Sequence, residues 1–205
     1  ELSSQAWNPL RLKSRAPDRT TYLRRPDLGR LLDEGDAAKL RPVPGGCDVC
    51  LVVGDGLSAL AIERHAGPLL ATLKPLLPPA WRLGPPAIAS QARVGLADDI
   101  GEHLGARLSV MLIGERPGLS SPDSLGIYLT FGPRRGRTDA QRNCISNVRP
   151  QGLPPAAAAA RLAWLMRESL ARGLSGVELK DESNDTALAA GPSAPRPLSN
   201  KETPE

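Results

Sequence analysis

The middle of the chain alternates between continuous apolar runs and segments in which apolar residues recur at helical spacing. The runs at 49–53 and 107–113 are almost uninterrupted, which predicts strands buried on both faces. Shorter runs at 87–94 and 127–131 predict two more strands. Strands of this kind, separated by helices, are typical of an α/β fold with a mainly parallel sheet.

Helical spacing connects the predicted strands. It predicts a short helix at 27–40, a longer one at 59–77, and a third that Asp98 caps and Gly105 ends. The clearest pattern, over 154–173, has two prolines at its start, an alanine run, and a glycine just past its end. The strand at 49–53, its glycine turn and the following helix form half of a βαβ unit.

Three regions follow from this pattern in a chain of 205 residues. Residues 1–20 mix polar and basic residues without a clear period and are predicted to form an irregular arm. Residues 21–180 are predicted to form one α/β domain, to which 177–179 add a short edge strand. Residues 181–205 are rich in Ser, Pro, Ala, Asn and charge, which bury too little surface to offset ordering, so we expect a disordered tail.

Charge and composition argue against nucleic acids and membranes as partners. The formal net charge of +4 comes from arginine, which outnumbers lysine, but the arginines are scattered and aromatic residues make up only 3%. We therefore expect no nucleic-acid binding, which needs a basic patch and stacking platforms. No apolar run reaches the ~20 residues that a bilayer requires, and no signal pattern opens the chain, so we expect a cytoplasmic protein without membrane contact.

The sequence offers no catalytic or metal-ligating set. Cys47 and Cys50 have the spacing of a redox or zinc motif, but they begin a predicted strand and are expected to be packing residues. The remaining candidates, Cys144, His65 and His103, lie far apart without ligand spacing. Neither histidine lies in a loop, and no nucleophile elbow is present, so we predict no catalytic residue and no metal site.

Two carboxylates mark a ligand site at the strand ends. The strand at 107–113 stops at Gly114 and Glu115 and continues into a loop of Pro, Gly and Ser, which is where α/β folds bind ligands. In a parallel sheet Asp55, which follows the strand at 49–53, reaches the same edge. The segment Gly54–Ser58 can contact an anion or ribose there through the free N–H groups of a helix N-terminus, or Asp55 can simply cap the helix or stabilise the turn.

Four motifs follow one another along the chain: Tyr22–Arg30, Cys47–Val49 with Asp55–Ser58, Gly114–Leu119, and Cys144–Asn147. In this order and spacing they resemble one family, the small subunit of ethanolamine ammonia-lyase. The resemblance covers about residues 16–181.

The resemblance implies a Rossmann-like domain that helps bind adenosylcobalamin. By similarity to the family, the cobalamin contacts fall on the backbone amide of Val94, on Glu115 and on Cys144. The implied activity is that of a carbon–nitrogen lyase in ethanolamine catabolism, in which a large subunit converts ethanolamine to acetaldehyde and ammonia. The small subunit is then a non-catalytic part of a hetero-oligomer, located in the cytoplasm or within a bacterial microcompartment.

Two other hypotheses stay open from the residues alone. A free-standing nucleotide-binding or hydrolytic α/β protein would use Asp55 and Glu115. A scaffold module would bind a partner through Arg24, Arg25 and the basic loop at 134–137 without any ligand.

Overall fold

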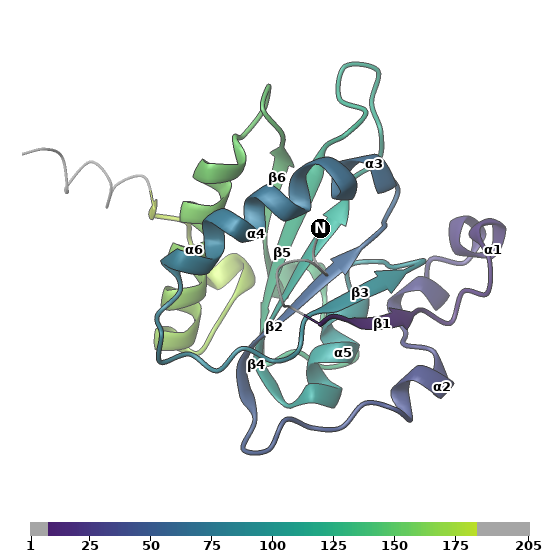
Figure 1. The fold of residues 1–205 in the computed structure, drawn as a ribbon, viewed down its shortest axis with the longest axis horizontal. Coiled ribbons are helices and arrows are strands. Elements are labelled where there is room, and N and C mark those ends of the chain that lie inside the picture. The colour runs from purple at the N-terminus through teal and green to yellow at the C-terminus, as the bar shows by residue number, and fades with distance from the viewer. Residues whose placement is uncertain (1–7, 184–205) are drawn as a thin grey trace, which may run out of the picture.

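A computed structural model of the chain describes residues 8–183 and shows a mixed α/β fold around one sheet (Figure 1). The sheet has six strands in the order β1-β3-β2-β4-β5-β6. The first four are parallel to one another, while β5 and β6 are antiparallel to their neighbours, so the prediction of a mainly parallel sheet is confirmed. The strands are β1 (Leu10–Lys13), β2 (Cys47–Gly54), β3 (Ala87–Ser90), β4 (Ala106–Gly114), β5 (Leu125–Phe131) and β6 (Arg142–Val148).

Helices cover both faces of the sheet. In Figure 1, α4 and α6 cross one face and α5 lies behind the other, with the short α1 and α2 beside β1. The α-helices are α1 (Arg19–Arg24), α2 (Glu34–Ala37), α3 (Ala59–Ala61), α4 (Gly67–Leu73), α5 (Leu96–Leu104) and α6 (Pro155–Arg172). Within the described residues, none of the helices is long and apolar enough to cross a membrane.

The central strand β2 is buried on both faces, as its apolar run predicts. Leu51 and Val53 belong to the core that α4 and α6 complete. Cys50 and Val52 point into the second core, against α5. Because successive side chains of a strand point to opposite faces, one strand serves both cores.

The predicted long helix at 59–77 is one helical path with a change of type in its middle. Between α3 and α4 lies a π-helical turn, Ile62–Ala66, and a 3-10 turn, Lys74–Leu76, follows α4. At the other end of the domain, α6 ends at Gly173, whose left-handed backbone (φ +72) matches the predicted stop signal.

Several expectations at the edges of the domain are wrong. β1 lies inside the predicted irregular arm of residues 1–20, where it pairs in parallel with β3. The helix predicted at 27–40 is interrupted, since a 3-10 turn, Leu28–Arg30, and α2 take its place. The strand predicted at 177–179 is a 3-10 turn, Gly176–Glu178.

Two further differences concern the limits of elements. β3 ends at Ser90 rather than at 94, because Gln91 adopts a left-handed backbone (φ +55) that turns the chain out of the sheet. β6 was not predicted, because only Ile145 and Val148 of its residues are buried. Most of the predicted tail, 181–205, lies outside the described residues.

The prediction that Asp98 caps a helix is wrong, because α5 begins after Gly95 and Asp98 lies within its first turn. It forms instead a buried ion pair with Arg142 of β6, whose Nη2 and Nε donate to Asp98 Oδ2 at 2.5 and 3.1 Å. The Ser109 hydroxyl donates to the other carboxylate oxygen at 3.0 Å. The side chains of Asp98 and Arg142 are only 2% and 6% exposed. The ion pair therefore connects the sheet edge to α5 in a place that solvent hardly reaches.

The turn after β2 lies directly against the end of β4. The Leu57 N–H donates to the Gly114 carbonyl at 2.9 Å. A Cβ on Gly56, whose φ is +56, would come within 2.3 Å of that carbonyl oxygen, and a Cβ on Gly114 within 2.0 Å of the Ser58 carbonyl oxygen. Only two glycines allow the backbones to approach this closely.

We expect Gly114→Ala to lower the free energy of unfolding by about 3 kcal/mol or more, because the new methyl group overlaps backbone atoms. Gly136→Ala is the matched control. Gly136 also has a positive φ (+85), but nothing lies within 4 Å of its Cβ position, so only the backbone strain of about 1 kcal/mol applies. Urea unfolding of the two variants measures the difference, and equal losses would contradict the close approach.

We expect Arg142→Met to lower the free energy of unfolding by about 3–5 kcal/mol, because it leaves the Asp98 carboxylate buried without a counter-charge. Arg172→Met removes an exposed partner of Glu168 on α6 and is expected to change stability by less than about 1 kcal/mol. Chemical denaturation of both variants provides the comparison. If Arg142→Met lowered the free energy of unfolding no more than Arg172→Met does, the buried ion pair would not be required for stability.

Candidate functional site

The carboxyl ends of β2 and β4 open onto a cavity of about 390 Å³. The register pairs Gly54 of β2 with Ile113 of β4, so the residues after both strands meet at one edge, as the parallel arrangement predicts. Side chains and backbone from five segments line the cavity. They include Tyr22 of α1, Leu57 of the turn after β2, Arg93 and Val94 of the loop after β3, Glu115 after β4, and Tyr128 of β5.

Glu115 lines the cavity, and only one of its two carboxylate oxygens accepts hydrogen bonds from the described residues. Its Oε2 accepts hydrogen bonds from the Ser124 hydroxyl and from the Asn147 N–H, the latter at 3.3 Å. Its Oε1 lies over Gly126, where a Cβ would come within 3.0 Å. No group within residues 8–183 donates a hydrogen bond to this Oε1. The free oxygen is a ready acceptor for a ligand.

Val94 also lines the cavity, from the loop between β3 and α5. The neighbouring Arg93 N–H donates to the Gly29 carbonyl at 2.8 Å, and the Val94 carbonyl accepts from Ala97 at 3.2 Å. The Val94 N–H itself has no acceptor in the described part of the chain. Val94 and Glu115, two residues that line the same cavity, thus carry a donor and an acceptor without a partner among residues 8–183.

Cys144 lies beside the cavity rather than in its wall. It is exposed on β6, where it is the Cα partner of Tyr128, and Tyr128 lines the cavity. Desolvation, with a smaller contribution from the Glu115 charge, raises the pKa of the Cys144 thiol, although its interaction with Tyr128 opposes the rise. The thiol is therefore protonated near neutral pH and acts as a small polarisable contact rather than a nucleophile.

The cavity has an aromatic and cationic side that sequence analysis did not assign. Tyr22 is fully buried, with the Arg19 and Arg93 guanidinium groups 4.6 and 4.3 Å from its ring centroid. Its hydroxyl donates to the Ala92 carbonyl at 3.0 Å. The only sequence signal was that Tyr22 opens the first family motif. Its partner Arg93 comes from a distant loop, which no local pattern connects to it.

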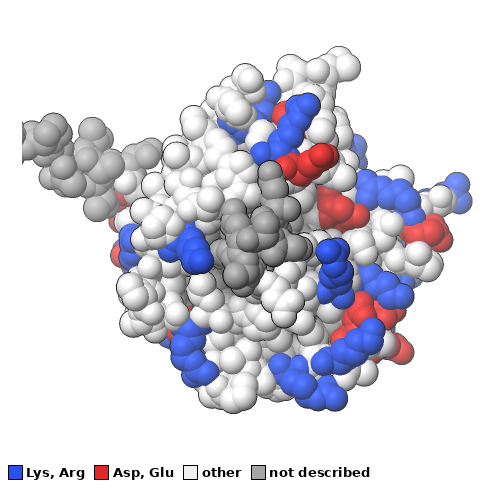
Figure 2. Space-filling model, viewed as in Figure 1, with Lys and Arg blue, Asp and Glu red and all other residues white. Residues whose placement is uncertain are grey.

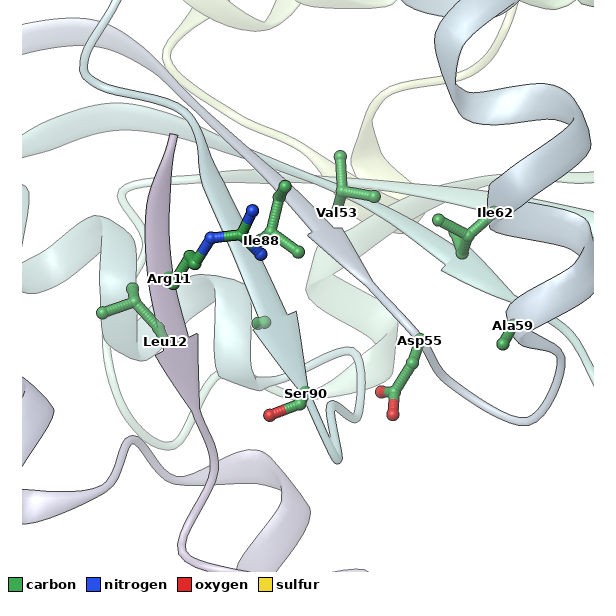
Figure 3. Close-up of a pocket in the computed structure, with 9 residues that line it drawn as sticks. Arg11, Leu12, Val53, Asp55, Ala59, Ile62, Ile88 and Ser90 are labelled. Carbon is green, nitrogen blue, oxygen red and sulfur yellow. The ribbon is translucent and has the colours of Figure 1, made fainter. Parts of the chain in front are cut away.

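Both carboxylate oxygens of Asp55 accept hydrogen bonds from backbone N–H groups. Its Oδ1 accepts from the N–H groups of Gly56 and Ala92, both at 2.9 Å, and its Oδ2 accepts from Gln91 at 3.0 Å. Figure 3 shows it at the end of a second hollow of about 240 Å³, whose other lining is largely apolar. With both oxygens bound to backbone, Asp55 holds the loop after β3 against the end of β2.

The other candidate residues are either buried in the core or bound to neighbouring side chains and backbone. Cys47 and Cys50 are buried and unpaired, and burial raises the pKa of both thiols. His65 lies 3.1 Å from Asp123, and His103 Nδ1 lies 2.8 Å from the Asp99 carbonyl oxygen. Across 8–183 no three His, Cys, Asp or Glu side chains group as a metal site would require.

Charges are interleaved over the surface. On the face in Figure 2, Lys and Arg side chains lie next to Asp and Glu side chains around the edge and form no continuous basic patch. Two arginines that a scaffold would use have acidic neighbours, since Arg25 pairs with Asp27 at 2.6 Å and Arg135 with Asp99 at 2.8 Å. The geometry thus favours the cavity over a basic surface as the functional site.

Comparison with known proteins gives the family. Residues 1–180 match the family model described as ethanolamine ammonia-lyase light chain (EutC). The ethanolamine ammonia-lyase small subunit of Azotobacter vinelandii is 59% identical over 199 residues, which are 95% of this chain and 74% of that protein. The small subunit of Ralstonia nicotianae is 55% identical over 93% of this chain and 73% of that protein.

A third relative, from Pseudomonas putida strain W619, is 54% identical over 89% of this chain and 69% of its own length, and carries the same name. The name of these relatives implies a large subunit as partner. The match to the family model over residues 1–180 and this degree of identity show that the chain belongs to the family of ethanolamine ammonia-lyase small subunits, each one part of a lyase complex.

Proposed function

We propose that this chain helps hold adenosylcobalamin at the ends of β2 and β4, while a large subunit converts ethanolamine to acetaldehyde and ammonia. The observation that carries the proposal is that two residues lining one cavity each keep a polar group without a partner among residues 8–183, the Val94 N–H and Glu115 Oε1. The proposed contacts are Val94, Glu115 and Cys144.

The donor set fits the cofactor. The rim of a corrin carries amide side chains, each of which has both N–H donors and a carbonyl acceptor. Glu115 Oε1 can accept from one such amide, and the Val94 N–H can donate to the carbonyl of another. When bound, adenosylcobalamin supplies the radical that starts the reaction. Every residue assigned here binds and orients, and none takes or gives a proton.

The size of the cavity supports a shared site. A space of about 390 Å³ is too small to enclose a whole cobalamin. The chain would therefore form one wall of a cleft, and the large subunit would close it from the other side. Cys144 lies at the edge of this wall, where a small side chain lets a bulky ligand approach closely.

The topology supports a Rossmann-like description of the parallel half. Strands β1, β3, β2 and β4 are parallel, and the proposed site lies beyond their carboxyl ends, as in other α/β sheets that bind nucleotides or related cofactors. The antiparallel pair β5 and β6 departs from that pattern and brings Tyr128 and Cys144 to the site. The cytoplasmic or microcompartment location stays a prediction.

Replacing Glu115 tests the proposal. In the complex with the large subunit, we expect Glu115→Ala to raise the Kd for adenosylcobalamin about tenfold or more, because a hydrogen bond to a charged group contributes about 1.5–3 kcal/mol. The KM for ethanolamine should stay within twofold. Glu178→Ala, at an exposed glutamate of a surface turn, is the control. Equal losses of cofactor and substrate affinity would contradict the assignment.

Alkylation of Cys144 gives a second, independent test. Because the pKa of this thiol is raised above its usual 9.0, we expect its rate of reaction with iodoacetamide in the complex to keep rising above pH 9. Adenosylcobalamin should slow the reaction at each pH, as measured by mass spectrometry of the Cys144 peptide. The buried Cys47 and Cys50 should stay unlabelled in the folded protein. Labelling of Cys144 at the same rate with and without cofactor would remove it from the site.

A further inference from the structure

The loop between β4 and β5 is closed at its base by two contacts between Glu115 and Ser124. The Glu115 N–H donates to the Ser124 carbonyl at 2.9 Å. The Ser124 hydroxyl donates in turn to Glu115 Oε2. Ser124 is only 6% exposed, so its hydroxyl meets the carboxylate with little competition from water. The backbone and the side chain of Glu115 are thus held by the same residue.

Ser124 is itself fixed through its neighbour Asp123. Arg64 Nη1 donates to Asp123 Oδ2 at 2.9 Å, and His65 Nε2 lies 3.1 Å from the same oxygen. Hydrogen bonds from Arg64 and His65, and their charges, hold the pKa of Asp123 below its usual range, so it stays ionised at neutral pH. One residue earlier, the Pro122 carbonyl accepts from the Ser58 hydroxyl at 3.0 Å.

The anchoring residues come from an uncommon piece of helix. Arg64 and His65 lie in the π-helical turn Ile62–Ala66 between α3 and α4. Such turns are rare, are often found at functional sites, and change the direction of side chains relative to a regular α-helix. Here both basic side chains reach the same carboxylate, and this connects the helix after β2 to the loop after β4.

We propose that Ser124, anchored through Asp123, is a positioning residue that sets the Glu115 carboxylate for its ligand. This rests on the proposed function, in which Glu115 contacts adenosylcobalamin. With Oε2 held by Ser124, the side chain of this cavity-lining residue is confined to one orientation, and Oε1 is left available to a ligand. Fixing a rotamer before binding reduces the entropy lost when the ligand arrives, which raises affinity without adding a contact.

Coupling between the two side chains tests the positioning role. In the complex with the large subunit, the Kd for adenosylcobalamin is measured by equilibrium dialysis for Ser124→Ala, Glu115→Ala and the double variant. We expect Ser124→Ala alone to raise Kd about fivefold, and to change it less than twofold when Glu115 is already alanine. A residue that only stabilises the loop would raise Kd equally in both backgrounds, and that result would overturn the proposal.

Controls separate positioning from folding. Ser120→Ala removes an exposed serine of the same loop and should leave Kd unchanged. The thermal midpoint and subunit stoichiometry of each variant report folding and assembly, and the KM for ethanolamine should not change. If Ser124→Ala does not fold, Ser124→Cys keeps the side-chain size with a weaker donor, and the same cycle applies. A Glu115→Ala complex with unaltered Kd would refute the proposed function itself, whereas unaltered Kd in the Ser124 variants alone would refute only the positioning role.

Discussion

The site depends on one close backbone contact, between the turn after β2 and the end of β4. Gly56 and Gly114 lack the Cβ atoms that would keep these segments apart, and the Leu57 N–H reaches the Gly114 carbonyl at 2.9 Å. The contact sets where α3 begins, because Ser58 both accepts from Ala61 at its start and donates to Pro122 of the next loop. It also fixes the point at which Glu115 leaves the sheet. The backbone contact therefore determines where the cavity lies, and the side chains around it determine its shape and polarity.

The parts of the fold that depend on complete burial could be predicted from the sequence. β2 and β4 lie between two helical layers, so both faces of each strand are apolar and the pattern is continuous. Parallel pairing of these strands then places their carboxyl ends together, and this was enough to predict that Glu115 lies at the edge where the cavity is found. Gly105 and Gly173 both adopt the left-handed conformation expected just past a helix end.

The parts that were missed obtain their structure from neighbours. β1 buries Leu12 but few other side chains, so its four residues carry no pattern that differs from a coil. β6 is mostly polar. It forms a strand because it pairs with the edge of β5 and because Arg142 forms an ion pair with Asp98. The role of Asp55 depends on amides of the loop after β3, which sequence spacing cannot place. Tertiary contacts decide such segments, and local propensity does not.

On the proposed function, the binding free energy available from Glu115 and Val94 is too small to hold the cofactor without a partner subunit. On the proposed assignment, a hydrogen bond to the Glu115 carboxylate contributes about 1.5–3 kcal/mol and one from the Val94 N–H about 0.5–1.5 kcal/mol. A Kd of 1 mM already corresponds to about 4 kcal/mol, and association also costs translational and rotational freedom. The polar contacts of the chain alone thus give no more than weak binding. Tight retention requires that a second surface cover the cofactor and exclude water, and the open cavity beside Cys144 leaves room for one. The hydrogen bond from Ser124 to Glu115 matters here because the binding free energy from these contacts is small. If the Glu115 side chain is already ordered, less of that free energy is lost in ordering it when the cofactor binds.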